Sequence, residues 1–493
     1  MNRALRRISI AVLVMFVLLL VNVSYLQGLD TASLASKPGN SRAFYAAQNQ
    51  YQRGSIVTSD GKVIAASRLS SGNDSIKYQR YYPSGPEYAP VTGYYTIFGA
   101  TGIEAAKNSL LSGNDSSLDV RKIIDLITGK TTKGATVQVT INSKAQDAAW
   151  NALKALGKPG AVVALNPKTG AVLAMASYPS FDPNVLAIHD GAKLNKIDKK
   201  LLKDPAQPLL NRALQGTYPP GSTFKIVTSS ALLTQSPSTT INTNVASPTT
   251  LSLPQTQHIL HNDQGEACGD GSGQAPLITA FAQSCDTTFA KIGIQVGANA
   301  LNDMAGQFGM NNPDLTIPLP VAQSNYVIPA SQALTAYTAI GQQNDTVTPL
   351  QEAMFAAAVA NGGTLMKPDL VQQVTASDLS TVQGMSPSVL RHSISSSVSD
   401  SMKQMMLAVV QQPEGTAYAF RQDVTGVEIA GKTGTAETGA VSLNDAAFTS
   451  FAPFANPNIA VGVIIQGGGY GASAAAPIAV QVIKAYQRAV GNQ

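Results

Sequence analysis

Three short motifs hold the residues of this sequence that could carry out covalent chemistry. They are Ser222-Thr223-Phe224-Lys225, Ser284-Cys285-Asp286 and Lys432-Thr433-Gly434. A serine hydroxyl is a weak nucleophile unless a base lies beside it, and residues i and i+3 share one face of a helix. Ser222 and Lys225 are therefore expected to meet, with Lys225 as the base. Together, in this order, the motifs predict an acyl-transfer site built on serine and lysine.

The neighbouring residues fit this chemistry. Lys225 can act as a base only when neutral, and both burial and a nearby cation lower a lysine pKa. Lys432 would supply that cation. Pro219-Pro220-Gly221 cannot continue a helix, so a helix is predicted to begin at Ser222. The free backbone N–H groups at such a helix start can polarise a carbonyl group.

The sequence offers no competing catalytic system. It has four histidines, and His258 and His261 lie in a polar stretch without a second pair of ligands. We therefore predict no metal site and no cofactor. A histidine-based serine triad would need G-x-S-x-G around its serine, which Tyr218-Pro219-Pro220-Gly221-Ser222 does not match.

Longer stretches of the chain resemble the class B penicillin-binding proteins, in particular their actinobacterial penicillin-binding protein A type. The matching stretches, over nearly the whole length, are Arg53-Gly54-Ser55-Ile56, Asp60-Gly61, Tyr82-Pro83, Gly102-Ile103-Glu104, Asn166-Pro167-Lys168-Thr169-Gly170, Tyr178-Pro179-Ser180-Phe181-Asp182-Pro183-Asn184 and Asn211-Arg212-Ala213. The resemblance implies an α/β fold of the α+β type. This is the penicilloyl-serine transferase fold, also called β-lactamase/transpeptidase-like, with a small N-terminal class B module.

The resemblance also implies a role for each motif residue. Ser222 would be the nucleophile and Lys225 its general base, while Ser284 would relay a proton to the leaving amine. Lys432 and Thr433 would bind the terminal carboxylate of a stem peptide or a β-lactam. Gly434 would let the strand backbone approach the substrate. The backbone N–H groups of Ser222 and Thr435 would form the oxyanion hole.

Asp286 departs from the family pattern, which usually has asparagine as the third residue of the second motif. An asparagine amide can donate a hydrogen bond to the substrate, whereas a carboxylate only accepts. A carboxylate beside Lys225 would also raise the lysine pKa. We therefore expect Asp286 to line the substrate cleft and to face a backbone N–H or Lys432 rather than Lys225.

The first thirty residues predict a membrane anchor. Arg3, Arg6 and Arg7 precede an uncharged, mostly apolar run at 8–29, which is long enough to span a bilayer of about 30 Å. The positive-inside rule places the N-terminus in the cytoplasm and the remainder outside. A cleaved signal peptide is the alternative, with Ser33-Leu34-Ala35 as a weak cleavage site. The net charge of +5 is spread out and indicates no nucleic-acid binding.

The chain divides into a tail, an anchor, a stalk and two folded parts. The expected ranges are 1–7 for the cytoplasmic tail, 8–29 for the anchor, 30–45 for the stalk, 46–150 for the N-terminal module and 151–493 for the transpeptidase domain. The module is of the pedestal or dimerisation type. It leaves no room for the glycosyltransferase domain that a bifunctional class A protein would carry.

Hydrophobic patterns predict an antiparallel sheet packed by helices in the second part. Strands are expected at 161–165 and 171–176, joined as a hairpin, and at 448–452 and 459–466. Helices are expected after Ser222 and at 145–156, 277–296, 350–361 and 477–490. Short strands are expected in the module at 56–57, 63–65 and 137–141.

Cys268 and Cys285 are the two cysteines of the chain, and both fall outside the membrane under this topology. Oxidising surroundings permit a disulfide between them. The alternative is a pair of unpaired buried thiols.

The function implied is a peptidoglycan D,D-transpeptidase that cross-links D-Ala-D-Ala stem peptides through an acyl-enzyme and is inhibited by β-lactams. It would serve cell wall synthesis and cell division, with a separate glycosyltransferase and divisome proteins as partners. A D,D-carboxypeptidase on the same site is the first alternative. A β-lactamase is disfavoured because no glutamate lies between Glu266 and Glu352 to activate a deacylating water. A non-catalytic β-lactam-binding scaffold is disfavoured by the complete set of serines and lysines.

Overall fold

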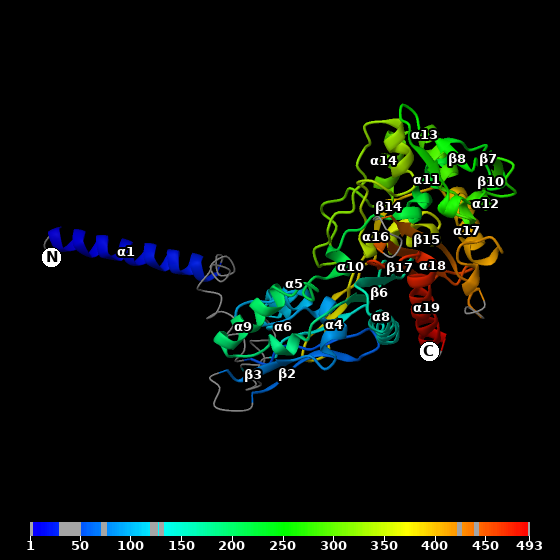
Figure 1. Ribbon diagram of the computed structural model, residues 1–493. Coiled ribbons are helices and arrows are strands. Elements are labelled where there is room, and N and C mark those ends of the chain that lie inside the picture. The colour runs from blue at the N-terminus through cyan, green and yellow to red at the C-terminus, as the bar shows by residue number, and fades with distance from the viewer. Residues whose placement is uncertain are drawn as a thin grey trace.

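The computed structural model describes residues 3–28, 51–70, 76–118, 127, 133–421, 426–437 and 443–491. Helix α1 (Arg3–Gly28) covers the predicted anchor as far as residue 28 (Figure 1). Its stretch Arg6–Leu26 is apolar and long enough to cross a membrane. The predicted stalk at 30–45 lies outside the described residues.

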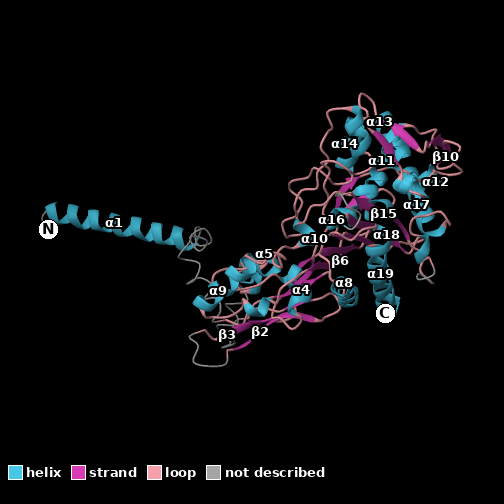
Figure 2. Cartoon of the chain, viewed as in Figure 1, coloured by secondary structure: helices cyan, strands magenta, loops and turns pink. Residues whose placement is uncertain are grey.

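A five-stranded antiparallel sheet forms the centre of the C-terminal part (Figure 2). Its strands, in spatial order, are β15 (Ala430–Ala436), β16 (Asp445–Ala452), β17 (Ile459–Ile465), β5 (Gly160–Leu165) and β6 (Val172–Tyr178). The predicted hairpin is the pair β5 and β6, and β17 joins it to the C-terminal strands. β15, which contains the Lys432-Thr433-Gly434 motif, forms an edge of the sheet.

Helices cover both faces of this sheet, which explains why β5 and β17 are buried along their whole length. α16 (Pro349–Ala360) packs against β5, β16 and β17, and every one of its residues is buried. α8 (Ser143–Leu156) packs on β6, and α19 (Ala476–Gly491) packs on α8, β16 and β17. The Asn142 side chain caps α8 by accepting from the backbone N–H groups of Lys144 and Ala145.

A mostly helical region lies beyond the β15 edge. Its helices are α11 (Lys225–Gln235), α12 (Leu277–Ala282), α13 (Asp286–Val296), α14 (Ala298–Gln307), α15 (Gln332–Thr338) and α17 (Ser396–Gln411). Small strands lie around it, at β7 (Asn244–Ala246), β8 (Thr250–Ser252), β9 (Ile259–His261), β10 (Gln274–Pro276), β11 (Thr364–Met366) and β14 (Val389–His392). The short helix α10 (Arg212–Gln215) instead packs on β5, β6 and α16. The prediction of one helical stretch over 277–296 is wrong, because the helix is interrupted between the end of α12 and the start of α13.

A second sheet carries the N-terminal module. Its spatial order is β13 (Thr381–Gly384), β12 (Val371–Thr375), β4 (Thr136–Val139), β1 (Ile56–Val57), β2 (Val63–Leu69) and β3 (Tyr78–Tyr81). β12 and β13 come from the stretch that follows α16, so two distant parts of the chain build this sheet. Its helices are α4 (Gly85–Thr92), α5 (Gly102–Ala106), α6 (Asn108–Leu111) and, from later in the chain, α9 (Gly191–Leu202).

A buried ion cluster brings together the N-terminal motifs that are separate in the sequence. The Glu104 carboxylate accepts from Arg53 Nε at 2.6 Å and from Arg80 Nε at 2.6 Å, and the Tyr82 hydroxyl donates to it at 3.2 Å. Burial by itself raises the pKa of Glu104, but the two guanidinium groups hold that pKa below its usual value. Each charge is therefore paired within the core of the module.

Candidate active site

The first motif lies in a tight turn that leads into α11. Gly221 to Phe224 form a 3₁₀ turn, and the α-helix starts at Lys225. Gly221 has φ +54°, and a Cβ there would come within 2.5 Å of the Thr435 carbonyl oxygen. Only glycine therefore fits at this contact. The turn places Lys225 Nζ 3.0 Å from Ser222 Oγ, as a nucleophile and its base require.

The second motif lies at the break between α12 and α13. Ser284 adopts φ +62°, which is uncommon for a residue other than glycine. This conformation turns the Ser284 hydroxyl toward both lysines of the other motifs. Lys225 Nζ lies 3.1 Å from Ser284 Oγ, and Lys432 Nζ lies 2.8 Å from it. The Ser284 carbonyl oxygen also accepts from Lys225 at 2.7 Å.

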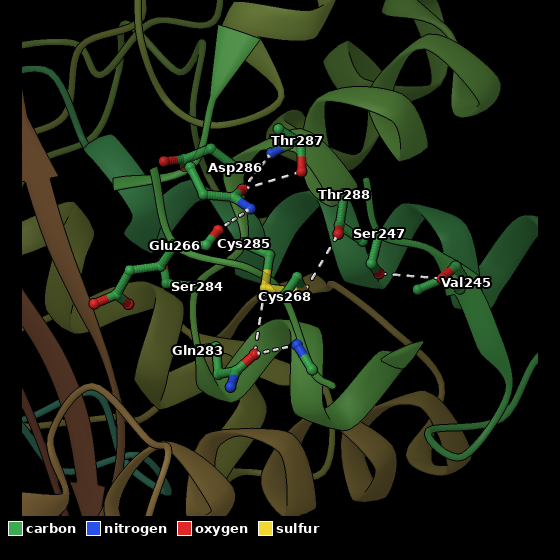
Figure 3. The surroundings of a disulfide bond; sticks show 12 residues. Val245, Ser247, Glu266, Cys268, Gln283, Ser284, Cys285, Asp286, Thr287 and Thr288 are labelled. Atoms are coloured by element: carbon green, nitrogen blue, oxygen red, sulfur yellow. Dashed lines mark hydrogen bonds between the residues drawn. A yellow bond between two sulfur atoms is a disulfide. The ribbon is translucent and has the colours of Figure 1, made fainter. Parts of the chain in front are cut away.

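A disulfide holds the residue after Ser284. The structure joins Cys285 to Cys268, which lies in the polar loop before α12 (Figure 3). Gln283, which directly follows α12, contacts the same loop, because its side-chain oxygen accepts from the Gly269 backbone N–H at 2.7 Å. Together they tie the break that carries Ser284 to the neighbouring loop.

The third motif lies on the edge strand β15. Lys432 Nζ donates to Ser284 Oγ, and the hydroxyls of Thr433 and Thr416 lie 2.7 Å apart. A Cβ on Gly434 would come within 2.7 Å of the Pro220 carbonyl oxygen and 2.9 Å of Thr223 Cγ2. The glycine is therefore needed for close packing between the strand and the nucleophile turn.

Both lysines are fully buried, and this burial sets their charge balance. Burial lowers the pKa of Lys225, while the charge of Asp286 and its hydrogen bond oppose that shift. Burial is the main cause that holds the pKa of Lys432 well below its usual range, and the charge of Lys225 is the second cause. Both amines contact Ser284 Oγ, so a charge on either lysine disfavours a charge on the other.

The predicted orientation of Asp286 is wrong. Its Oδ1 lies 2.6 Å from Lys225 Nζ in an ion pair, and the Asp286 side chain is 22% exposed. Asp286 is the first residue of α13, directly after the break, so its side chain projects toward the same point as the Ser284 hydroxyl. This counter-charge favours the charged form of a lysine that has no exposed surface, and so it opposes the effect of burial.

The structure thus brings the predicted site residues into one cluster. The contacts above link Ser222, Lys225, Ser284, Asp286 and Lys432. Thr433, Gly434 and Thr435 follow on the same edge strand, beside the nucleophile turn.

Two further residues of the site were not predicted. Thr416 lies in the loop after α17, and its sequence carries no signal. Glu352 lies on α16 under the nucleophile turn, with Oε1 2.7 Å from Thr223 Oγ1. A charged residue within the apolar run of α16 is a signal that could have identified it.

Comparisons with known proteins agree with this geometry. Residues 160–484 match the penicillin binding protein transpeptidase domain, and residues 53–137 match the penicillin binding protein A dimerisation domain. The chain is 39% identical to the peptidoglycan D,D-transpeptidase PbpA of Mycolicibacterium smegmatis, over 99% of each chain. It is 38% identical to PbpA of Mycobacterium tuberculosis, over 98% of this chain and 99% of that protein.

A solved structure of similar shape is penicillin-binding protein A from M. tuberculosis as a ceftriaxone acyl-enzyme complex. It matches with a TM-score of 0.84 and 37% identity, covering 89% of this chain and 99% of that chain. Fold and site together define a penicilloyl-serine transferase. The chain belongs to the class B penicillin-binding proteins, with a transpeptidase domain and an N-terminal dimerisation domain of the penicillin-binding protein A type.

Proposed function

We propose that this protein is a serine-type peptidoglycan D,D-transpeptidase that forms its acyl-enzyme on Ser222 and is inhibited covalently by β-lactams. The observation that carries this proposal is the 3.0 Å contact between Ser222 Oγ and Nζ of the fully buried Lys225. The names of the relatives, and the acyl-enzyme complexes formed by penicillin-binding protein A, support the same reaction.

The hydrogen bonds of Lys225 suit a neutral amine. A neutral amine has two protons and one lone pair. The Ser284 carbonyl oxygen and the Asp286 carboxylate only accept, so they take the two protons. The lone pair is then available for the hydroxyl proton of Ser222, which is the role of a general base.

These contacts, together with the family resemblance, support a reaction in two stages. Ser222 Oγ attacks the carbonyl carbon of the penultimate D-Ala, and its proton moves to Lys225. The peptide C–N bond breaks as Ser284, which contacts both lysines, passes a proton to the leaving amine of the terminal D-Ala. Lys432 and Thr433 bind the terminal carboxylate, and the backbone N–H groups of Ser222 and Thr435 bind the oxyanion. An acceptor amine then attacks the ester, and Ser222 Oγ recovers a proton.

We also propose a single-pass topology, with the N-terminus in the cytoplasm and the catalytic domain outside. The apolar stretch Arg6–Leu26, with Arg3, Arg6 and Arg7 at its start, supports this arrangement. A role in cell division, and dependence on a separate glycosyltransferase and divisome proteins, belong to the same proposal. The N-terminal module, which matches the dimerisation domain of penicillin binding protein A, and the transpeptidase names of the relatives favour an amine acceptor over water.

Mass spectrometry of the full chain in detergent, treated with penicillin, tests the acylation site. We expect one adduct, mapped to Ser222, that persists for many minutes and is absent from Ser222→Ala. Labelling at another serine would exclude the assignment, and fast turnover of penicillin would indicate a β-lactamase. Incubation with a stem peptide and a D-amino acid then separates the two acceptors, since exchange of the terminal residue requires an amine.

A further inference from the structure

Glu352 is a fully buried carboxyl group that the reaction above does not use. It lies on α16, directly under the first motif, and has no exposed surface. Its Oε1 lies 2.7 Å from Thr223 Oγ1, and its Oε2 has no hydrogen-bond partner among the described residues. A buried carboxyl group in such a place needs an explanation, because an unpaired charge would be costly there.

A count of protons shows which form of Glu352 fits. Thr223 Oγ1 lies 2.7 Å from Glu352 Oε1 and 2.8 Å from the Pro220 carbonyl oxygen. The Thr223 hydroxyl has one proton to donate, and a carbonyl oxygen and a carboxylate can only accept. With an ionised Glu352, one of these two short contacts has no proton. With a neutral Glu352, the acid donates to Thr223 and Thr223 donates to Pro220, so both contacts are hydrogen bonds.

The surroundings of Glu352 also favour the neutral form. The elements packed against α16 are α10, α17, β5, β11, β16 and β17. The ionisable side chains on these elements are those of Arg212, Asp400, Lys403 and Asp445, and none of them forms a hydrogen bond or ion pair with Glu352. Burial raises the pKa of Glu352 to about 8.

The turn that Glu352 supports has little room to move. A Cβ on Gly434 would come within 2.7 Å of the Pro220 carbonyl oxygen, and one on Gly221 within 2.5 Å of the Thr435 carbonyl oxygen. The chain of contacts from Glu352 through Thr223 to Pro220 therefore sets how the turn lies against β15. Ser222 and Thr435, whose N–H groups are assigned to the oxyanion hole, lie on either side of this contact.

We propose that Glu352 is a positioning residue, held as a neutral carboxylic acid, whose proton locks the Thr223–Pro220 turn against β15. Loss of that proton breaks the chain of hydrogen bonds from Glu352 through Thr223 to Pro220 and leaves a buried charge without a partner. The turn then shifts, and acylation of Ser222 slows. This inference rests on the proposed role of Ser222 as the nucleophile.

The test compares the full chain with Glu352→Gln, whose amide can donate to Thr223 at any pH. The rate of acylation by a fluorescent penicillin is measured from about pH 6 to about pH 9.5. At the acid end we expect the two proteins to agree within about threefold. Above the pKa of Glu352 the wild-type rate should fall, relative to that of Glu352→Gln, by up to about tenfold per pH unit. Thr223→Val, which removes the hydroxyl group between Glu352 and Pro220, should be acylated slowly over the whole pH range.

Glu87→Gln is a matched control. Burial raises the pKa of Glu87 to about 8 as well, but this residue lies on α4 of the N-terminal module. The acylation rate of the Glu87→Gln protein should fall at alkaline pH as that of the wild type does. Superimposable wild-type and Glu352→Gln profiles would overturn the proposal, as would a Glu352→Gln protein that fails to fold. A longer-lived acyl-enzyme in Glu352→Gln would overturn it in favour of a deacylating base.

Infrared difference spectra give a readout that does not depend on acylation. At neutral pH, subtraction of Glu352→Gln from the wild type should leave the carbonyl stretch of a protonated carboxylic acid. A carboxylate band in its place would contradict the proposal, even if Ser222 were not the nucleophile.

Discussion

At the scale of single residues, the site depends on a conflict between two needs of Lys225. As a base it must lose its proton, and its complete burial favours that loss. The carboxylate of Asp286, 2.6 Å away, favours the charged form. The balance between burial and this ion pair therefore controls how much of the enzyme has a neutral base at a given pH.

Asp286→Asn should shift this balance. Removing the carboxylate removes what raises the pKa of Lys225, so the acid limb of the acylation rate should move to lower pH. At neutral pH we expect a change of about tenfold or less, because the amide can still accept from Lys225. The measurement is acylation by fluorescent penicillin against pH. Asp263→Asn is a control that should shift the limb in the same direction by less, since Asp263 acts on Lys225 only through its charge. If Asp286→Asn were as inactive as Ser222→Ala, Asp286 would be an essential catalytic group.

At the scale of elements, the break between α12 and α13 carries the second motif. Ser284 has φ +62°, a conformation that costs about 1 kcal/mol or more and persists only where its surroundings enforce it. The disulfide of Cys285 and the bond between Gln283 and Gly269 supply that enforcement (Figure 3). The loop and the two helices thus act together to present one hydroxyl group.

Reduction of the disulfide should weaken both stability and acylation. For a closed loop of this size, the entropy model gives a loss of about 3 kcal/mol in the free energy of unfolding. Acylation should slow severalfold as Ser284 becomes less well held. Thermal unfolding and acylation are measured with and without a reductant. The Cys268→Ser/Cys285→Ser double variant should not respond to the reductant. Two free thiols in the unfolded, unreduced chain would show that the bridge does not form.

Gly434→Ala should impair the site without unfolding the protein. The new methyl group would lie 2.7 Å from the Pro220 carbonyl oxygen, so β15 and the nucleophile turn must separate. We expect acylation to fall by about a hundredfold, equivalent to about 2.7 kcal/mol of barrier. Gly384→Ala is the control, because a Cβ at that strand position meets nothing within 4 Å. Equal acylation rates for the two variants would show that the contact is not needed.

At the scale of the whole molecule, the N-terminal module and the catalytic domain are built from interleaved parts of the chain. β12 follows α16 in the sequence but pairs with β4 of the module sheet (Figure 1). The buried cluster around Glu104 stabilises the same module. The module is therefore joined to the catalytic domain through sheet pairing as well as through the chain connection.

Glu104→Gln should destabilise the module strongly. The change leaves the guanidinium groups of Arg53 and Arg80 buried without a carboxylate, and breaking such a buried ion cluster typically costs about 3–5 kcal/mol. The lowered pKa of Glu104 gives the sign of the pH dependence. The wild-type advantage should be complete above the ordinary glutamate pKa and lost as the pH falls through the depressed value.

Denaturant unfolding at several pH values measures this effect. Asp147→Asn is the matched control, since its ion pair with Lys62 is about one-third exposed on each side. That change should alter stability by about 1 kcal/mol or less. Equal effects of the two substitutions would mean that the Glu104 cluster does not stabilise the module.

The chemistry and much of the secondary structure could be predicted from the amino-acid sequence. The types and order of Ser222, Lys225, Ser284 and Lys432 indicated a serine–lysine acyl-transfer site. Each motif can be interpreted from neighbouring residues alone, because its reactive side chains have a spacing that suits one turn or one strand. The hairpin of β5 and β6 and the helix α16 were likewise predictable, since continuous apolar runs between turn residues mark buried elements.

The partners of these residues could not be predicted, because they depend on tertiary packing. Asp286 faces Lys225 because the break at Ser284 reorients the start of α13. Glu352 meets Thr223 because α16 packs under a turn 129 residues away in the chain. β12 joins the module sheet because the fold brings it beside β4, from which it is distant in the chain. Such contacts depend on how whole elements pack, and the residues near each one in the sequence do not record the partner that packing brings to it.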